Sequence, residues 1–345
     1  MKKLMAVILV MTLCLSLAAC KKNNVAESAS PSPSSVATPT PSATPVPVKP
    51  VVAGVPHDGI RPVAVVIDNQ GEESFPQAGL SQAQIVYEFL VEGGITRYIG
   101  LFWESEMDLV GPVRSARDYM LDIIMPYDAI FVHNGGSPSA LNEIDYEKKV
   151  DSFDGTKSAN KIFEDITDNP NNWQDTFTTS EKINAYIGET EVATTTALKG
   201  YPNYSSQDIT LEQGTDAKII NISYSTVSFC TYMYDAEKKL YFRNRNGETH
   251  VDRNTNEPIS TTNIIVQKVK SEVIEGDDAG RLSVELIGAG EGYYCTLGKC
   301  IQITWAKADE ESPTVYKDMN GNEIDLNEGS TWIQIVPMSI DLLIL

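Results

Sequence analysis

Histidine and positive charge are both scarce in this 345-residue sequence. The three histidines, His57, His133 and His250, are far apart in the chain, so a multi-histidine zinc site is not expected. Lys and Arg number 27 against 47 Asp and Glu, and the formal net charge of −20 argues against a nucleic-acid-binding protein. No Gly-x-Ser-x-Gly, Walker or dinucleotide-binding motif occurs either.

Long apolar runs are also lacking, with one exception at the start of the chain. This run extends from Leu4 to Leu17, follows two lysines and leads into Leu-Ala-Ala-Cys20. About 15 apolar residues are fewer than the ~20 that span a bilayer, and small residues before a cysteine are typical of lipoprotein cleavage. We therefore favour a lipoprotein signal peptide, residues 1–19, over a short transmembrane anchor. Cys20 would then carry a diacylglyceryl anchor with palmitate-like chains.

The next segment, residues 20–60, is rich in Ser, Thr, Ala and Pro and has no hydrophobic periodicity. Such a composition predicts an extended, polyproline-like, disordered tether. Without residues 1–19 the chain has 25 basic and 47 acidic residues, a net charge of −22. The tether would hold this acidic body away from the membrane, on the extracytoplasmic face of a bacterial cell.

Three cysteines remain after Cys20, which is an odd number. Cys295 and Cys300 flank Thr-Leu-Gly-Lys, a plausible hairpin loop, and a cross-strand disulfide is one interpretation. The favoured alternative is that both are small, partly buried apolar residues. Their spacing does not match a metal-binding motif, and we expect neither a metal nor a cofactor.

The region 61–210 shows mixed α and β patterns. Residues 61–68 and 84–92 are apolar and typical of buried strands, and Gly93-Gly94 before 95–104 predicts a two-residue hairpin turn. Gly111-Pro112 predicts the start of a helix over about 113–126, because proline suits the first helical position. Residues 129–133 again resemble a strand.

The region 221–345 has strand patterns and no helix signal. Asn-Gly pairs at 246–247 and 320–321 each predict a hairpin turn. An EF-hand is not indicated around Asp318, because Gly321 and Gly329 occupy the wrong positions. The predicted fold class is α+β, a mixed α/β domain (61–210) followed by an all-β domain (221–345).

Two groups of charged residues are candidate site residues. In the predicted hairpin, Glu88, Glu92 and Arg97 would share one face of the sheet, either as ordinary surface ion pairs, which is favoured, or as acid/base groups with an arginine beside them. In the predicted helix, Arg114 and Arg117 would lie near the positive end of the dipole, with Asp118 beside them.

Such paired arginines require an anionic partner. Internal carboxylates are favoured as that partner, with Asp68, Glu88 and Glu92 as candidates, over the carboxylate or phosphate of a ligand. His133 and Asn134, at the end of a predicted strand before a Gly-Gly loop, are further binding candidates, although a lone histidine is more often structural.

Four segments, RPVAVVIDN, GLSQAQIVYEFLVEGGITR, GPVRSARDYM and VHNGGSP, occur in this order, and the chain resembles the YerB-like lipoprotein family. YFRNRNGETHVD and DMNGNEIDLNEGSTWIQIV resemble that family's C-terminal domain. The resemblance implies a two-domain, membrane-tethered lipoprotein but no reaction, because the domains have no known function. Relatives carry Pro-His-Asn where this chain has Pro170-Asn171-Asn172, so a histidine-dependent activity would be impaired or different.

The leading hypothesis is a lipid-anchored extracytoplasmic binding module for a cell-envelope component or a partner protein. The alternative is a hydrolase or lytic enzyme acting on cell-wall glycan or peptide, with Glu88, Glu92 or Asp118 as acid/base. A purely structural role is a third alternative. An enzyme should hold one of these carboxyl groups in a cleft with a raised pKa, whereas a binding module should leave Arg114 and Arg117 unpaired and open to solvent.

Overall fold

The computed structural model describes residues 54–103, 106–169 and 171–345. The signal peptide, Cys20 and most of the expected tether, as well as Pro170, lie outside the described residues. The described residues all belong to one compact unit.

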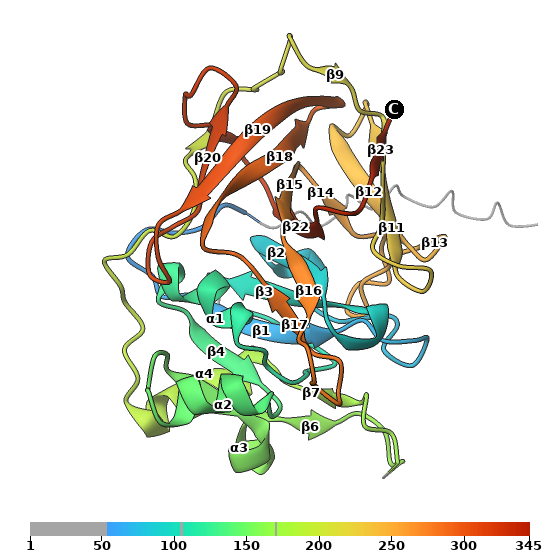
Figure 1. The fold of residues 1–345 in the computed structure, drawn as a ribbon. Helices are drawn as coiled ribbons and strands as arrows, with labels where there is room; N and C mark the ends of the chain where they lie inside the picture. Colours follow the sequence, from blue (N-terminus) through green and yellow to red (C-terminus); the bar gives the residue numbers. More distant parts are fainter. Residues whose placement is uncertain (1–53, 104–105, 170) are drawn as a thin grey trace, which may run out of the picture. The chain divides into compact units, whose positions relative to one another are not determined.

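Within this unit, strands from both predicted regions build one 11-stranded sheet (Figure 1). Its N-terminal members are β1 (Val63–Asp68), β2 (Ile85–Leu90), β3 (Thr96–Phe102), β4 (Ile130–His133) and β5 (Ser152–Asp154). Its C-terminal members are β9 (Thr215–Asp216), β15 (Asn263–Val269), β18 (Gly288–Thr296), β19 (Lys299–Lys307), β20 (Val315–Asp318) and β22 (Thr331–Pro337). The two regions meet where β22 pairs in parallel with β2.

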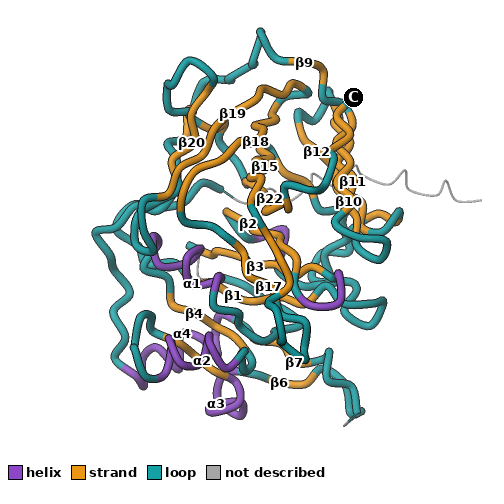
Figure 2. Tube along the Cα trace, viewed as in Figure 1, coloured by secondary structure: helices purple, strands orange, loops and turns teal. Residues whose placement is uncertain are grey.

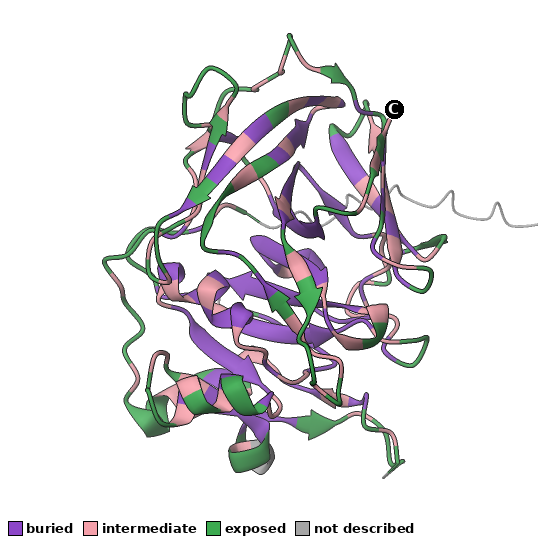
Figure 3. Cartoon of the chain, viewed as in Figure 1, coloured by how far each residue is buried: buried purple, intermediate pink, exposed green. Residues whose placement is uncertain are grey.

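The middle of this sheet is buried on both faces (Figure 3). Along β1, Ala64 and Val66 belong to one hydrophobic cluster, whereas Val65 and Ile67 belong to another on the opposite face. Successive side chains of a strand point to opposite faces, so an unbroken apolar run such as VAVVI contributes to both clusters. Both clusters draw residues from the two predicted regions, so these regions share their cores.

A second, six-stranded sheet packs against one of these clusters. It consists of β10 (Ile219–Ser223), β11 (Phe229–Asp235), β12 (Leu240–Arg245), β13 (Glu248–Thr249), β14 (Ser260–Thr261) and β23 (Leu342–Ile344). Three two-stranded pairs complete the strands: β6 (Glu164–Asp165) with β7 (Thr176–Phe177), β8 (Tyr204–Ser205) with β21 (Leu326–Asn327), and β16 (Ser271–Val273) with β17 (Leu282–Val284).

The α-helices lie on the side of the large sheet where β1 and β4 are found (Figure 2). They are α1 (Tyr119–Ile124), α2 (Pro138–Asp145), α3 (Gly155–Ile162) and α4 (Ser180–Thr190), with short 3₁₀ helices η1 (Leu80–Gln82), η2 (Glu92–Gly94) and η3 (Met125–Tyr127). No helix occurs in 221–345, all of which is described. The α+β fold class is thereby confirmed.

The predicted helix over 113–126 is wrong in its first half. The N–H groups of Val113 and Arg114 donate to the carbonyl oxygens of Thr176 and Val66, at 2.8 and 2.9 Å, so this segment extends the sheet instead of starting a helix. Helix α1 begins only at Tyr119, after Asp118 accepts a hydrogen bond from its N–H group. The proline therefore did not mark the start of a helix.

The predicted hairpin register is also wrong, by one residue. Leu90 pairs with Thr96, and Val91 donates to the carbonyl oxygen of Ile95 at 2.9 Å, so three residues form the turn instead of two. A shift of one residue turns side chains to the opposite face of the sheet. Glu88 therefore lies opposite Tyr98, and it does not share a face with Arg97.

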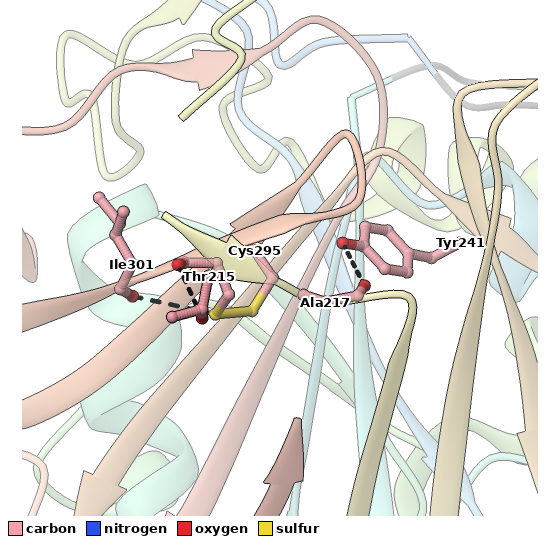
Figure 4. The surroundings of a disulfide bond; sticks show 6 residues. Thr215, Ala217, Tyr241, Cys295 and Ile301 are labelled. Carbon is pink, nitrogen blue, oxygen red and sulfur yellow. Dashed lines mark hydrogen bonds between the residues drawn. A yellow bond between two sulfur atoms is a disulfide. The ribbon is translucent and has the colours of Figure 1, made fainter. Parts of the chain in front are cut away.

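Other local predictions agree with the structure. Asn246-Gly247 joins β12 to β13 with Arg245 opposite Glu248, as the Asn-Gly signal predicts. The Asp318 segment is a turn whose carboxylate accepts hydrogen bonds from the N–H groups of Asn320 and Asn322, both at 2.9 Å. Cys295 and Cys300 form a disulfide between β18 and β19 (Figure 4). The favoured alternative, that both are small unpaired residues, is therefore wrong.

Candidate functional site

Arg97 on β3 is the most unusual charged residue of the described part of the chain. Only 4% of its surface is exposed. Its Nη1 donates to the carbonyl oxygen of Ser115 at 2.8 Å, whereas its Nε has no hydrogen-bond partner. No carboxylate of the described residues lies within 4.0 Å of this guanidinium. Burial, together with the positive charges of Arg117 and Arg114, lowers the pKa of Arg97 to about 10, although the more distant charges of Asp68 and Glu92 oppose this.

Arg114 lies beside it, in the extended segment that follows Pro112. Its Nε is 3.3 Å from Oδ2 of the fully buried Asp68, which also accepts a hydrogen bond from Gln174 at 2.8 Å. The guanidinium stacks over the ring of Trp173, 4.3 Å from its centroid, and Trp173 is half exposed. Burial lowers the pKa of Arg114, although Asp68 opposes this. Trp173 directly follows the segment where relatives would carry the missing histidine.

Arg117 is held by Glu92 of the β2–β3 turn. Its Nε and Nη2 donate to the two carboxylate oxygens at 2.5 and 2.6 Å, which is a bidentate pair. Burial alone would raise the pKa of Glu92, but the hydrogen bond and charge of Arg117 outweigh it, and the pKa is lowered. Glu92 is therefore fully ionised at neutral pH, which does not meet the expectation for a general acid.

We call Arg97, Arg114, Arg117, Asp68 and Glu92 the arginine cluster. Asp68 and Glu92 pair with Arg114 and Arg117, so internal carboxylates are their anionic partners, as the favoured alternative had it. Arg114 and Arg117 are both paired and largely buried. The expectation that a binding module leaves them unpaired and open to solvent is therefore not met. Three positive charges nevertheless face two negative ones. Arg97 is the member of the cluster without an ion-pair partner.

Glu88 belongs to a separate, fully buried network on the other face of the sheet. Its Oε2 is 2.7 Å from Nη2 of Arg243 on β12, and its Oε1 accepts from Thr96 at 2.9 Å. Arg243 also donates to Nδ1 of His250, which therefore donates through Nε2 to Gln77 at 2.8 Å. Burial and the charge of Arg243 lower the pKa of His250, so this ring is neutral. The network links the two sheets and opens to no solvent.

His133 ends β4 and is fully buried. Burial lowers its pKa, and the neutral ring donates from Nδ1 to the carbonyl oxygen of Gly135 at 2.8 Å while Nε2 accepts from Ser152 at 2.6 Å. Asn134 is half-buried, and its N–H group donates to the carbonyl oxygen of Arg114 at 3.0 Å. The ring nitrogens of His133 are thus both occupied within the protein, and the backbone of Asn134 is bonded to the Arg114 segment.

Asp118 and Asp122 lie one turn apart on α1 and line a cleft of about 260 Å³. Asp118 is the helix cap and also accepts a hydrogen bond from Ser139 at 3.1 Å. Burial raises the pKa of Asp122 to about 6, although the positive charge of Lys307 opposes this. Asp122 is thus a carboxyl group in a cleft with a raised pKa, the property that we expected of Glu88, Glu92 or Asp118 if the protein were an enzyme.

Lys307 of β19 lies behind Asp122, and the two residues line a small enclosed cavity of about 10 Å³. Only 2% of Lys307 is exposed, and its ammonium group donates to the carbonyl oxygens of Glu310 and Ser312. Burial lowers the pKa of Lys307 to about 8. The four-residue spacing in RDYMLD could have identified Asp122. No sequence signal marked Lys307, because α1, which lies beside it, is far away in sequence.

Among the described residues, no group of three or more His, Cys, Asp or Glu side chains is arranged to hold a metal ion. In the same part of the chain, no helix is long and apolar enough to cross a membrane. A more spacious groove, about 860 Å³, lies between β19 and β23 and includes no member of the arginine cluster.

The chain matches two domains described as protein of unknown function (DUF3048), the N-terminal domain over residues 52–198 and the C-terminal domain over 220–333. It is 33% identical over 291 residues to "Putative lipoprotein YerB" of Bacillus subtilis (strain 168), covering 80% of this chain and 81% of that protein. The chain belongs to the YerB-like lipoprotein family.

The family fold agrees with a solved structure. The crystal structure of the YerB protein from Bacillus subtilis matches with a TM-score of 0.72 and 28% identity, over 83% of this chain and 94% of that chain. The two family domains match separate parts of the chain, residues 52–198 and 220–333. In space, however, strands of both domains pair in one sheet. The family descriptions assign no reaction and no ligand.

Proposed function

We propose that this protein is a lipid-anchored extracytoplasmic binding module whose ligand presents an anionic group to Arg97. The observation that carries the proposal is a nearly buried guanidinium with an unpartnered Nε and, among the described residues, no carboxylate within the 4.0 Å of an ion pair. An ionised group buried without a partner is costly, and proteins normally pair it. A carboxylate or phosphate of the ligand would supply the missing charge.

The neighbours of Arg97 support recognition of a small, charged feature on a larger molecule. Arg114 and Arg117 are already fixed by Asp68 and Glu92, so they add positive potential without needing to reorganise. Trp173 offers an exposed ring face beside them, on which a sugar or another flat group would pack. Anionic cell-wall glycan or peptide, or an acidic segment of an envelope protein, has this chemistry.

The proposed location rests on the sequence and on the lipoprotein relative. Cleavage before Cys20 would attach the chain to the membrane through a diacylglyceryl group. The segment 20–60 would then let the acidic body reach cell-wall material beyond the lipid surface.

The test uses the chain from residue 20 with Cys20→Ser, incubated with purified cell-wall sacculi, followed by measurement of protein in the pellet. We expect retention that weakens about tenfold or more for Arg97→Gln, because one charge-assisted contact is lost. Arg281→Gln, which alters an arginine paired with Asp277 outside the cluster, is the matched control and should be retained normally. Equal retention of both variants would contradict the proposal.

A hydrolase acting on the cell wall is the second candidate, and Asp122 is the observation that favours it. A carboxyl group in an open cleft with a pKa near 6 is suited to general acid catalysis. The supernatant of the same incubation would contain released glycan or peptide fragments if the chain were an enzyme. Release that persists in Asp122→Asn would exclude this residue as the acid, and no release at all would exclude the activity on this substrate.

A further inference from the structure

A groove of about 860 Å³ lies between the edge strand β23 of the six-stranded sheet and the strand β19 of the large sheet, and its lining includes no residue of the arginine cluster. Strand β23 of the six-stranded sheet contributes one part of its lining, and β18 and β19 of the large sheet contribute another (Figure 1). The segment beside the disulfide also borders it, where Thr215 and Ile301 lie close together (Figure 4). Its apolar lining residues are Leu211, Tyr293, Ile301, Met319, Leu342 and Ile344.

Strand β23 is an edge strand with unused backbone groups. It pairs with β10 on one side, and no strand lies on its other side. Leu345 and Ile219 exchange both backbone hydrogen bonds at 2.9 Å, so the alternating antiparallel pattern directs the N–H and C=O groups of Leu342 and Ile344 away from β10. No hydrogen bond of these groups occurs among the described residues.

The same two residues line the groove, and their side chains pack partly against the core. A free strand edge next to an apolar groove is the geometry by which sheets bind extended peptides. Main-chain hydrogen bonds then provide affinity, and every second side chain of the peptide enters the groove.

The charge around the groove favours one kind of peptide. Three acidic residues, Glu212, Asp318 and Asp341, border it against one lysine, Lys268. The ammonium group of Lys268 is already bound to the carbonyl oxygen of Ile340, so it is not free to attract an anion. The whole chain carries a net charge of −20 as well, which would steer a basic partner towards it.

We propose that this groove binds an extended, basic segment of a partner polypeptide, which adds a strand to the free edge of β23. Apolar residues at alternate positions of that segment pack on Ile301 and Leu211, and Lys or Arg residues meet the acidic border. The interaction is independent of the arginine cluster, so one chain can hold an envelope component and a protein at the same time.

The probe is a synthetic peptide in which Lys and Val alternate, titrated into the chain from residue 20 with Cys20→Ser. Binding is measured by calorimetry and by amide hydrogen exchange. We expect the amides of Leu342 and Ile344 to become protected on binding, whereas those of Leu343 and Leu345 are unchanged because β10 already bonds them. Protection elsewhere, or none at saturation, would overturn the proposal.

Two matched peptides separate the parts of the argument. N-methylation of the amides that would face β23 removes main-chain hydrogen bonds and should weaken binding about tenfold or more. A peptide alternating Glu and Val should bind more weakly than the lysine peptide, and Asp341→Lys should reduce the difference. Unchanged affinity of the N-methylated peptide would exclude strand addition, and equal affinity of the acidic peptide would exclude charge recognition.

Discussion

Arg97 and Arg243 are both buried arginines, and the structure predicts opposite effects when each is replaced by methionine. Arg243 is 2.7 Å from Glu88, whereas Arg97 has no carboxylate partner among the described residues. Methionine has a similar length and no charge, so the substitution removes the charge with little change in volume. We expect Arg97→Met to stabilise the fold and Arg243→Met to destabilise it.

The magnitude for Arg97 follows from its pKa. A decrease from 12.5 to about 10 corresponds to about 3 kcal/mol, at 1.36 kcal/mol per pH unit. Because the folded pKa is below the unfolded one, this cost is fully present at every pH below about 10 and disappears only as the pH approaches 12.5. The lost hydrogen bond to Ser115 offsets about 1–2 kcal/mol. A net gain of about 1–2 kcal/mol in the free energy of unfolding is therefore expected at pH 7.

The magnitude for Arg243 has the opposite sign. Methionine there would leave Glu88 buried without its counter-ion, and such a change costs about 3–5 kcal/mol. It would also leave His250 without a donor at Nδ1. The two arginines are similarly buried, and the decisive difference between them is that a carboxylate accompanies Arg243 and not Arg97.

The assay is urea unfolding at pH 7 of the wild type and of both variants, followed by circular dichroism. Arg97→Lys retains the positive charge and is the control, for which no stabilisation is expected. A loss of stability in Arg97→Met comparable to that of Arg243→Met would refute the reasoning, because it would mean that the Arg97 charge is compensated in the ligand-free protein.

Three further predictions concern other parts of the fold. Asp122→Asn should stabilise the protein above pH 6 and have little effect below pH 4, because burial makes the ionised form of Asp122 unfavourable in the folded state. The free energy of unfolding measured across this pH range tests the prediction. Replacing Cys295 and Cys300 by serine should lower the free energy of unfolding by about 2 kcal/mol, as expected for so short a loop, and chemical denaturation would detect it. Gly247→Ala should cost about 1 kcal/mol in thermal unfolding, because residue 247 has a φ of 88°, and no loss would contradict the turn assignment.

Local sequence patterns correctly predicted the elements whose conformation depends mainly on residues that are neighbours in sequence. The apolar run VAVVI predicts a strand buried on both faces, and β1 is one. Asn246-Gly247 predicts a tight turn because both residues tolerate positive φ. The helix predicted from Pro112 was wrong in its first half, because the N–H groups of Val113 and Arg114 donate to the carbonyl oxygens of Thr176 and Val66. No local sequence pattern predicts these long-range hydrogen bonds.

The candidate site was predicted in part for the same reason. Arg97, Arg114 and Arg117 were named from the sequence, and so were Asp68 and Glu92 as their partners. The register of the β2–β3 hairpin decided which arginine would lack a carboxylate partner. Because the turn contains one more residue than predicted, the Glu88 side chain lies on the opposite face of the sheet from Arg97. Lys307 and the free edge of β23 could not be predicted, because segments distant in sequence bury the first and leave the second open.

The sequence by itself predicted a lipoprotein-type leader, and it determined the acidic charge, the α+β class and the family, because each of these depends on composition or on short contiguous motifs. The tertiary structure decided that the two regions share one sheet, that Glu88 pairs with Arg243, and that Arg97 stands without a counter-ion. Burial and pairing of charges are set by residues that approach from different segments, and only the folded chain brings those segments together.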